Sequence, residues 1–87
     1  MTYEIRVSER LEKILGKIPQ RARCRIVERI DGLAENPRPD DCKKLQGSKH
    51  PPLFRIRSGD YRIIYTVEDH VLIVLVLAIG HRRDIYR

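Results

Sequence analysis

Apolar side chains recur at every second position over residues 53–79, and this repeat constrains the fold more than any other feature. It covers three segments, 53–57, 61–67 and 71–79, which Ser58-Gly59-Asp60 and Glu68-Asp69-His70 separate. A period of two places alternate side chains on opposite faces of a strand. Short turns join antiparallel neighbours, so the pattern predicts a three-stranded antiparallel meander. The last segment is almost wholly apolar, which is typical of a central strand covered on both faces.

The first half of the chain predicts one strand and two helices. Residues 2–7 alternate polar and apolar side chains, and Ser8 follows as a helix N-cap. Apolar residues at helical spacing then predict a short helix up to Ile18 and a second one from Pro19 to the breaker Glu35-Asn36-Pro37. Residues 37–52 contain four prolines and predict a loop. The fold class is therefore α+β, in one domain over residues 1–87: an N-terminal strand, a helical hairpin and a three-stranded antiparallel meander.

Charge is distributed unevenly along the chain. The net charge is +6, of which residues 1–42 carry +1 and residues 43–87 carry +5. A basic excess in one half of a small domain favours a polyanionic partner. The longest apolar run has nine residues, whereas a membrane span needs about 20. No secretory signal is visible, and Cys24 and Cys42 lack metal-ligand spacing, so we expect a cytoplasmic protein with reduced thiols and no membrane partner.

Arginines interrupt the apolar pattern of the predicted meander. Arg55 and Arg57 stand two residues apart, so they share one face of their strand, opposite Phe54 and Ile56. The hairpin turn brings Arg62 back toward that strand, in a register that the sequence leaves open. The meander then ends on a second polar group, which comprises His81, Arg82, Arg83 and Tyr86. Because antiparallel neighbours run in opposite directions, we expect this group to meet the arginine hairpin.

These residue types fit the cleavage of RNA by its own 2′-hydroxyl. That reaction needs a base, an acid and cations for the dianionic transition state, and arginines supply the cations without a metal. Histidine, with a pKa of about 6.5, suits proton transfer, whereas arginine is a fixed donor to phosphate. The candidate catalytic residues are Arg62, Arg82, Tyr86 and His81. The candidate RNA-binding residues are Arg55, Arg57, Lys44 and Arg83, and neither metal nor cofactor is expected.

Each residue also has a purely structural interpretation. Arg55 and Arg57 would then solubilise an exposed strand, and Arg62 would pair with Asp60, Asp69 or Asp84. His81 would be a surface residue, and Tyr86 would pack near the end of the chain. Tyr61 and Tyr65 are assigned to packing. Three arginines of the second predicted helix are assigned to a solvated or partner-binding face: Arg21, Arg25 and Arg29.

Four short motifs follow one another in a distinctive order. They are Lys44-Leu45-Gln46-Gly47, Phe54-Arg55-Ile56-Arg57, Gly59-Asp60-Tyr61-Arg62-Ile63-Ile64-Tyr65 and Gly80-His81-Arg82-Arg83-Asp84-Ile85-Tyr86. With these motifs the chain resembles, over nearly its whole length, the RelE/ParE superfamily of toxins from type II toxin–antitoxin systems. In its RelE branch, the resemblance implies a toxin that enters the ribosomal A site and cuts the mRNA codon there without a metal. It implies active-site roles for Arg55, Arg57, Arg62, Arg82 and Tyr86, with His81 adjacent.

The same resemblance implies partners and leaves two other functions open. The partners are a cognate antitoxin protein, mRNA in the ribosomal A site, ribosomal RNA, and operator DNA through the antitoxin complex alone. Where well-known RelE toxins carry lysines on the first meander strand, this chain has Arg55 and Arg57, which shifts a general-base role toward His81 or Tyr86. The alternatives are a ParE-like inhibitor of DNA gyrase and an inactive RNA-binding member of the same fold.

Overall fold

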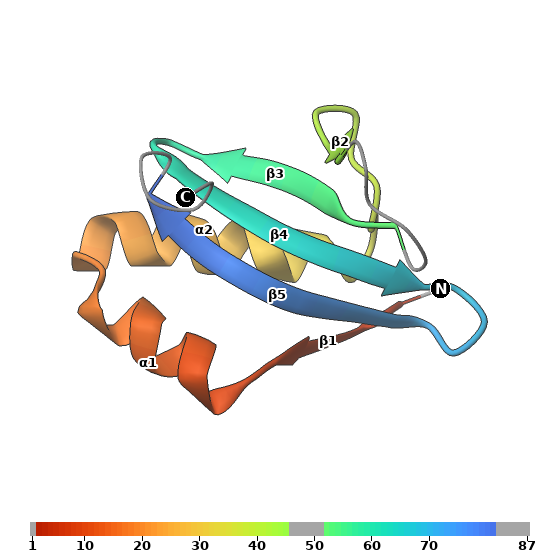
Figure 1. The fold of residues 1–87 in the computed structure, drawn as a ribbon, viewed down its shortest axis with the longest axis horizontal. Coiled ribbons are helices and arrows are strands. Elements are labelled where there is room, and N and C mark those ends of the chain that lie inside the picture. The colour runs from red at the N-terminus through yellow and green to blue at the C-terminus, as the bar shows by residue number, and fades with distance from the viewer. Residues whose placement is uncertain (1, 46–51, 82–87) are drawn as a thin grey trace.

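A five-stranded sheet and two helices make up the fold in a computed structural model, which describes residues 2–45 and 52–81 (Figure 1). The elements are β1 (Glu4–Val7), α1 (Glu9–Lys17), α2 (Gln20–Gly32), β2 (Lys43–Lys44), β3 (Phe54–Ser58), β4 (Tyr61–Glu68) and β5 (Ile73–His81). The strand order is β1-β5-β4-β3-β2. β1 runs parallel to β5, and all other neighbours are antiparallel. The predicted fold class, with its N-terminal strand, helical hairpin and meander, is confirmed.

Capping residues set the limits of the helical hairpin. The Oγ of Ser8 accepts a hydrogen bond from the Leu11 amide at 3.2 Å, as its predicted N-cap role requires. Ile18 is extended and ends α1, and Pro19 is the N-cap of α2. The prediction that α2 reaches Glu35-Asn36-Pro37 is wrong, since the helix ends at Gly32. The amides of residues 35 and 36 both turn back to the Gly32 carbonyl, and Pro37 disfavours a helical residue before it.

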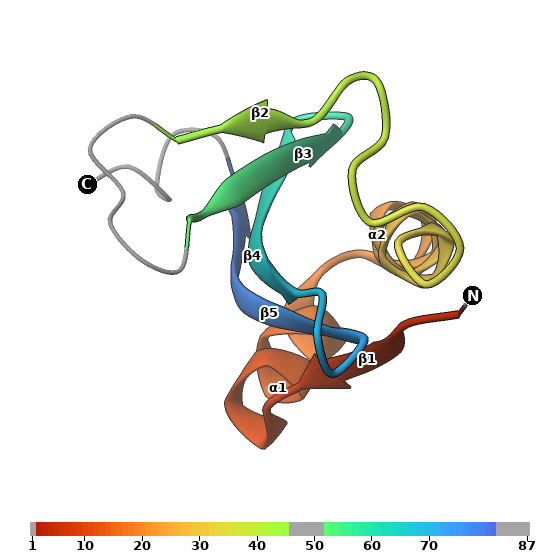
Figure 2. The same cartoon turned by 90° about the vertical axis from the view of Figure 1, so that its right-hand side faces the viewer.

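Both helices pack on one face of the sheet and enclose the core (Figure 2). Ile26 and Ile30 of α2, together with its C-cap Leu33, are buried against alternate residues of the central strands, and Leu11 of α1 joins them. The sheet contributes Ile56, Ile63, Tyr65, Val74 and Val76, each at most 2% exposed. We call this the helix face of the sheet and the opposite side its open face. No helix within the described residues is long and apolar enough to cross a membrane.

The structure corrects two expectations about β5. The strand begins at Ile73, two residues later than predicted, because Leu72 adopts a positive φ of 56° and still belongs to the preceding turn. β5 is central, but the expectation that both its faces are covered is wrong. Leu77 is 43% exposed, and Ile73 and Leu75 are only half-buried on the open face. The run is apolar although one of its faces remains accessible.

The predicted loop over residues 37–52 contains a short edge strand. β2 pairs with β3 through Lys43 opposite Arg55 and Lys44 opposite Phe54. The segment before it is attached to the far end of the sheet, where Arg38 donates to both carboxylate oxygens of Asp69 at 2.7 and 3.1 Å. The Tyr3 hydroxyl donates to the same carboxylate at 2.7 Å. These contacts fix the path of the chain from α2 to β2.

Candidate functional site

The register of the β3–β4 hairpin places two arginines directly opposite each other. Arg57 pairs with Arg62 across the hairpin, and Arg55 pairs with Ile64. Phe54 and Ile56 point into the core at 8% and 0% exposure, so the neighbouring arginines lie on the open face. Directly opposite side chains have Cβ atoms about 4.5–5.5 Å apart. The register that the sequence left open therefore brings Arg62 beside Arg57.

Arg62 is held in an unusual environment for a cation. Its Nε is buried and has no hydrogen-bond partner within the part of the chain that the structure describes. Asp69, one of the acids considered for it, is bound by Arg38 instead, and Asp84 lies outside the described residues. On its other side Arg62 faces Gly80 of β5, which contributes no side chain. A buried donor without a partner carries a free-energy penalty that a bound oxygen anion would remove.

A lysine that sequence reasoning missed joins these arginines. Lys43 is opposite Arg55 and therefore shares the open face with it, whereas Lys44, the predicted RNA-binding residue, is opposite Phe54. The four residues Lys43, Arg55, Arg57 and Arg62 are called the cationic strip below. Lys43 and Lys44 are the whole of a two-residue strand, which has no periodicity, so only the pairing register distinguishes them. A strip of this kind favours a polyanion such as the backbone of RNA.

A β-bulge places His81 on the other side of the sheet. The register between β4 and β5 shifts between Ile64 and Tyr65, and Leu77 has no partner. This extra residue reverses the alternation, so that Ile79 and His81 follow Val76 on the helix face and Gly80 faces Arg62. The predicted meeting of the end of β5 with the arginine hairpin is therefore observed for the backbone. It does not bring the imidazole to the face of Arg62.

The imidazole of His81 lies in a cavity of about 390 Å³ between the hairpin turn and α2. Its ring meets the Tyr61 ring edge to face, with centroids 5.6 Å apart. Arg25 of α2 lines the same cavity. The remaining predicted residues of this group, Arg82, Arg83 and Tyr86, lie outside the described residues. The arrangement thus has a strip of cations on one face of the sheet and an imidazole ring on the other, at the same end of the sheet.

Comparison with known proteins identifies the family. A family model described as the ParE toxin of the type II toxin–antitoxin system parDE matches residues 3–86. The chain belongs to this toxin family.

Relatives and solved structures agree with this assignment. The toxin is 33% identical to toxin RelG of Mycobacterium tuberculosis, over 100% of this chain and 99% of that protein. It is 29% identical to the mRNA interferase toxin RelE of Escherichia coli K12, over 94% and 85% of the two chains. It superposes on a chain of the archaeal RelE–RelB complex from Pyrococcus horikoshii with a TM-score of 0.83 at 32% identity, covering 97% and 99%. The resemblance to the RelE/ParE superfamily is confirmed.

Tyr65 of the toxin is a packing residue, as its pattern predicts. Its side chain is fully buried, and its hydroxyl donates to the Pro37 carbonyl at 2.7 Å. Its ring stacks on Phe54 with centroids 5.8 Å apart. Burial raises the pKa of this phenol far above its usual value, and the neighbouring Cys42 adds to the effect. Tyr65 therefore keeps its proton and serves the core.

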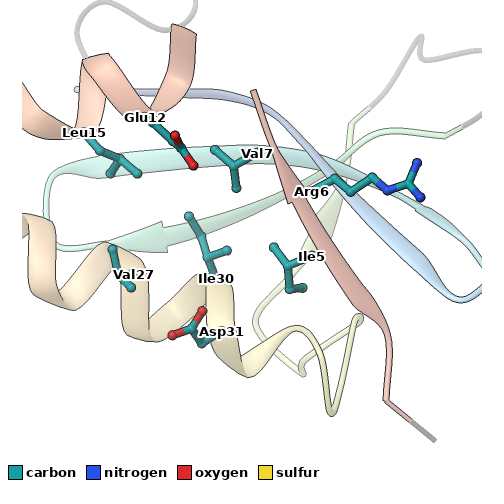
Figure 3. Close-up of a pocket in the computed structure, with 8 residues that line it drawn as sticks. All are labelled: Ile5, Arg6, Val7, Glu12, Leu15, Val27, Ile30 and Asp31. Atoms are coloured by element: carbon teal, nitrogen blue, oxygen red, sulfur yellow. The ribbon is translucent and has the colours of Figure 1, made fainter. Parts of the chain in front are cut away.

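A second surface of the toxin lies far from the cationic strip, where β1, α1 and α2 border a groove of about 610 Å³. Its walls are apolar, with Ile5, Val7, Leu15, Val27 and Ile30 (Figure 3). The carboxylates of Glu12 and Asp31 border the groove, whereas the Arg6 side chain points away from it and pairs with Glu4. An acidic segment of a partner protein would meet charges of its own sign within this groove.

Proposed function

We propose that this toxin is a metal-independent endoribonuclease that cuts mRNA in the ribosomal A site and so inhibits translation. The observation that carries the proposal is the cross-strand pair of Arg57 and Arg62 on the open face, with a buried Arg62 Nε that has no partner among the described residues. The E. coli and Mycobacterium relatives named mRNA interferase RelE and toxin RelG support it. An agent that acts on translating ribosomes works in the cytoplasm, which we propose as its location.

In the proposed reaction the 2′-hydroxyl loses its proton and attacks the adjacent phosphorus. The P–O5′ bond then breaks, leaving a 2′,3′-cyclic phosphate, and the departing O5′ takes a proton to become a hydroxyl. Two negative charges build up on the phosphorane in between. We assign their stabilisation to Arg62 and Arg82, with Arg55, Arg57, Lys43, Lys44 and Arg83 binding the flanking RNA backbone. Preorganised donors of this kind typically contribute about 100- to 1,000-fold in rate each.

Two residues are proposed for proton transfer, Tyr86 and His81. To reach a phosphate held by Arg62, the imidazole of His81 would have to leave its contact with Tyr61. That requirement favours Tyr86 as the base and leaves His81 as a residue that orients the end of β5. Tyr86→Phe should slow cleavage at least about tenfold. If the imidazole of His81 is the base, the cleavage rate should rise with pH in the wild-type toxin, and His81→Gln should remove this rise.

The deciding experiment is an mRNA cleavage assay mapped by primer extension, with and without translating ribosomes. We expect cuts within A-site codons when ribosomes are present. Arg62→Ala should abolish the cuts and the growth arrest in cells while the domain remains folded, and Arg21→Ala on the exposed surface of α2 is the matched arginine control. A fully toxic, folded Arg62→Ala variant would show that the assignment of the cationic strip is wrong.

The name of the matching family model favours one second candidate. The resemblance implies inhibition of DNA gyrase for ParE-like toxins, and a gyrase supercoiling assay with the purified toxin tests that activity. Inhibition of supercoiling with mRNA left intact would support this candidate. Salt-sensitive RNA binding without either activity would instead indicate an inactive member of the fold.

We infer that a cognate antitoxin is the toxin's protein partner. Solved structures that resemble this chain include RelE–RelB and RelBE complexes, and an E. coli RelE mutant with a peptide of its antitoxin. The complex, rather than the toxin alone, would contact operator DNA. Co-expression of the toxin with the protein encoded beside it should yield a stable complex that no longer cleaves mRNA.

A further inference from the structure

We propose that Arg29 of α2 is a positioning residue that holds Arg57 and Lys43 in the cationic strip. This inference rests on the proposed function, because it concerns the residues assigned to RNA binding. Arg29 was expected to lie on a solvated or partner-binding face together with Arg21 and Arg25. Its contacts separate it from them.

The guanidinium of Arg29 joins three parts of the chain. Its Nε donates to the Arg57 carbonyl at 3.1 Å, and its Nη2 donates to Asp41 at 2.7 Å. Its side chain is 32% exposed and that of Asp41 is 60% exposed, so both bonds lie at the surface. Arg57 lies near the end of β3, and Asp41 stands two residues before Lys43. One side chain thus connects a helix to β3 and to the approach to β2, two of the three strands that carry the strip.

The bond from Arg29 to the Arg57 carbonyl lies where β3 has, among the described residues, no neighbouring strand on its outer side. β2 pairs with β3 only at Phe54 and Arg55, and Arg57 lies beyond the end of this short strand. A strand edge that lacks a neighbouring strand can fray, because its backbone groups have no partner strand to hold them. The Nε of Arg29 takes the place of a third β2 residue at this carbonyl. It thereby holds the end of β3 where two like charges face each other.

The bond between Arg29 and Asp41 indicates that Arg29 positions other residues and does not itself bind phosphate. Asp41 neutralises Arg29, so the pair adds little net charge to the strip. The bond also fixes the approach to β2 and therefore the place of Lys43 opposite Arg55. Arg23 bonds to Gly16 within the helical hairpin. Within the described residues, Arg29 is thus the arginine of α2 with hydrogen bonds to β3 and to the approach to β2.

The test combines single-turnover cleavage on programmed ribosomes with a double-mutant cycle. Arg29→Met should slow cleavage between about 10- and 100-fold, the scale of a displaced binding group. In an Arg57→Met background the same change should have a smaller effect, because one of the two side chains that Arg29 positions is already absent. Arg29→Lys should not rescue activity, since an ammonium cannot reproduce the two bonds of the guanidinium fork. Arg21→Met, two turns earlier on α2 and exposed, should leave the rate unchanged.

If the wild-type toxin does not cleave mRNA, the proposed function is refuted, but the inference about Arg29 can still be tested by a second measurement. Amide hydrogen exchange in Arg29→Met should increase at β2 and the end of β3 while α1 keeps its protection. Binding of a single-stranded RNA oligonucleotide should weaken and lose part of its salt dependence. Unchanged exchange and binding would overturn the inference. So would additive rate losses in the double mutant, or full activity of Arg29→Lys.

Discussion

The environment of Arg62 predicts that this residue lowers the stability of the free toxin. Replacement by methionine keeps an unbranched apolar stem and removes the buried Nε, which has no partner among the described residues. Leaving a buried polar group unpaired costs about 1–3 kcal/mol. The like charge of Arg57 directly opposite adds about 0.2–1 kcal/mol. Arg62 is only half-buried, so the lower part of this range applies and we expect a gain of about 1–2 kcal/mol.

Urea unfolding followed by circular dichroism measures this gain. For a domain of this size about 1 kcal/mol corresponds to 4–8 °C, so a gain of about 1–2 kcal/mol in Arg62→Met should raise Tm by about 4–16 °C. The slope of the free energy of unfolding against urea should not change, because the same surface is exposed on unfolding. The same variant should have lost mRNA cleavage. Stability and activity would then change in opposite directions at one residue.

Two further variants separate the contributions. Arg57→Met removes only the like-charge repulsion, so its gain should be smaller, about 0.2–1 kcal/mol, and should shrink as salt screens the pair. Arg25→Met on the exposed surface of α2 should change stability by less than about 0.5 kcal/mol. If Arg62→Met is no more stable than Arg25→Met, the reasoning about the unpaired Nε is refuted.

Three other features of the fold give independent predictions. Tyr65→Phe leaves the Pro37 carbonyl without its donor and should lower the free energy of unfolding by about 1–2 kcal/mol in urea titrations. Ser8→Ala removes the N-cap of α1 and should cost about 1 kcal/mol by the same measurement, whereas Ser8→Asp should preserve stability. Hydrogen bonds from Arg38 and Tyr3 lower the pKa of Asp69, so its contribution to stability is present above about pH 4 and is lost as the pH falls through the folded-state pKa. Asp69→Asn should therefore be less stable than wild type at pH 7, and the difference should vanish in acid.

The sequence predicted those elements whose burial pattern extends over several residues. The three meander strands and both helices emerged because one side of each element is apolar over at least five positions. β2 did not, because a strand of two residues has no period. The parallel pairing of β1 with β5 also could not be read, since it depends on the hairpin of helices returning the chain to the far edge of the sheet. Local patterns specify elements, and only tertiary packing specifies their neighbours.

For the site, the sequence identified the charged residues, but it did not predict for all of them on which face of the sheet they lie. Arg55 and Arg57 follow strict alternation, so their face could be predicted. Lys44 was chosen where Lys43 holds the position opposite Arg55. His81 was expected beside the arginines, and one unpaired residue in β5, Leu77, reverses its side of the sheet. A β-bulge is set by the competing registers of two strands, and neither strand alone reveals it.

The repulsion within the cationic strip also connects the toxin's partners to its stability. An anionic ligand that binds the folded state of the toxin and not the unfolded state stabilises the fold by RT ln(1 + [L]/Kd). This stabilisation is about 2.7 kcal/mol at a ligand concentration 100 times Kd. A phosphate of mRNA and a carboxylate of an antitoxin would both satisfy Arg62 and separate the charges of Arg57 and Arg62. Either ligand would thus recover free energy that the free toxin lacks. An antitoxin carboxylate at Arg62 would therefore inhibit and stabilise through the same contact, and its stabilising effect should be much reduced in Arg62→Met.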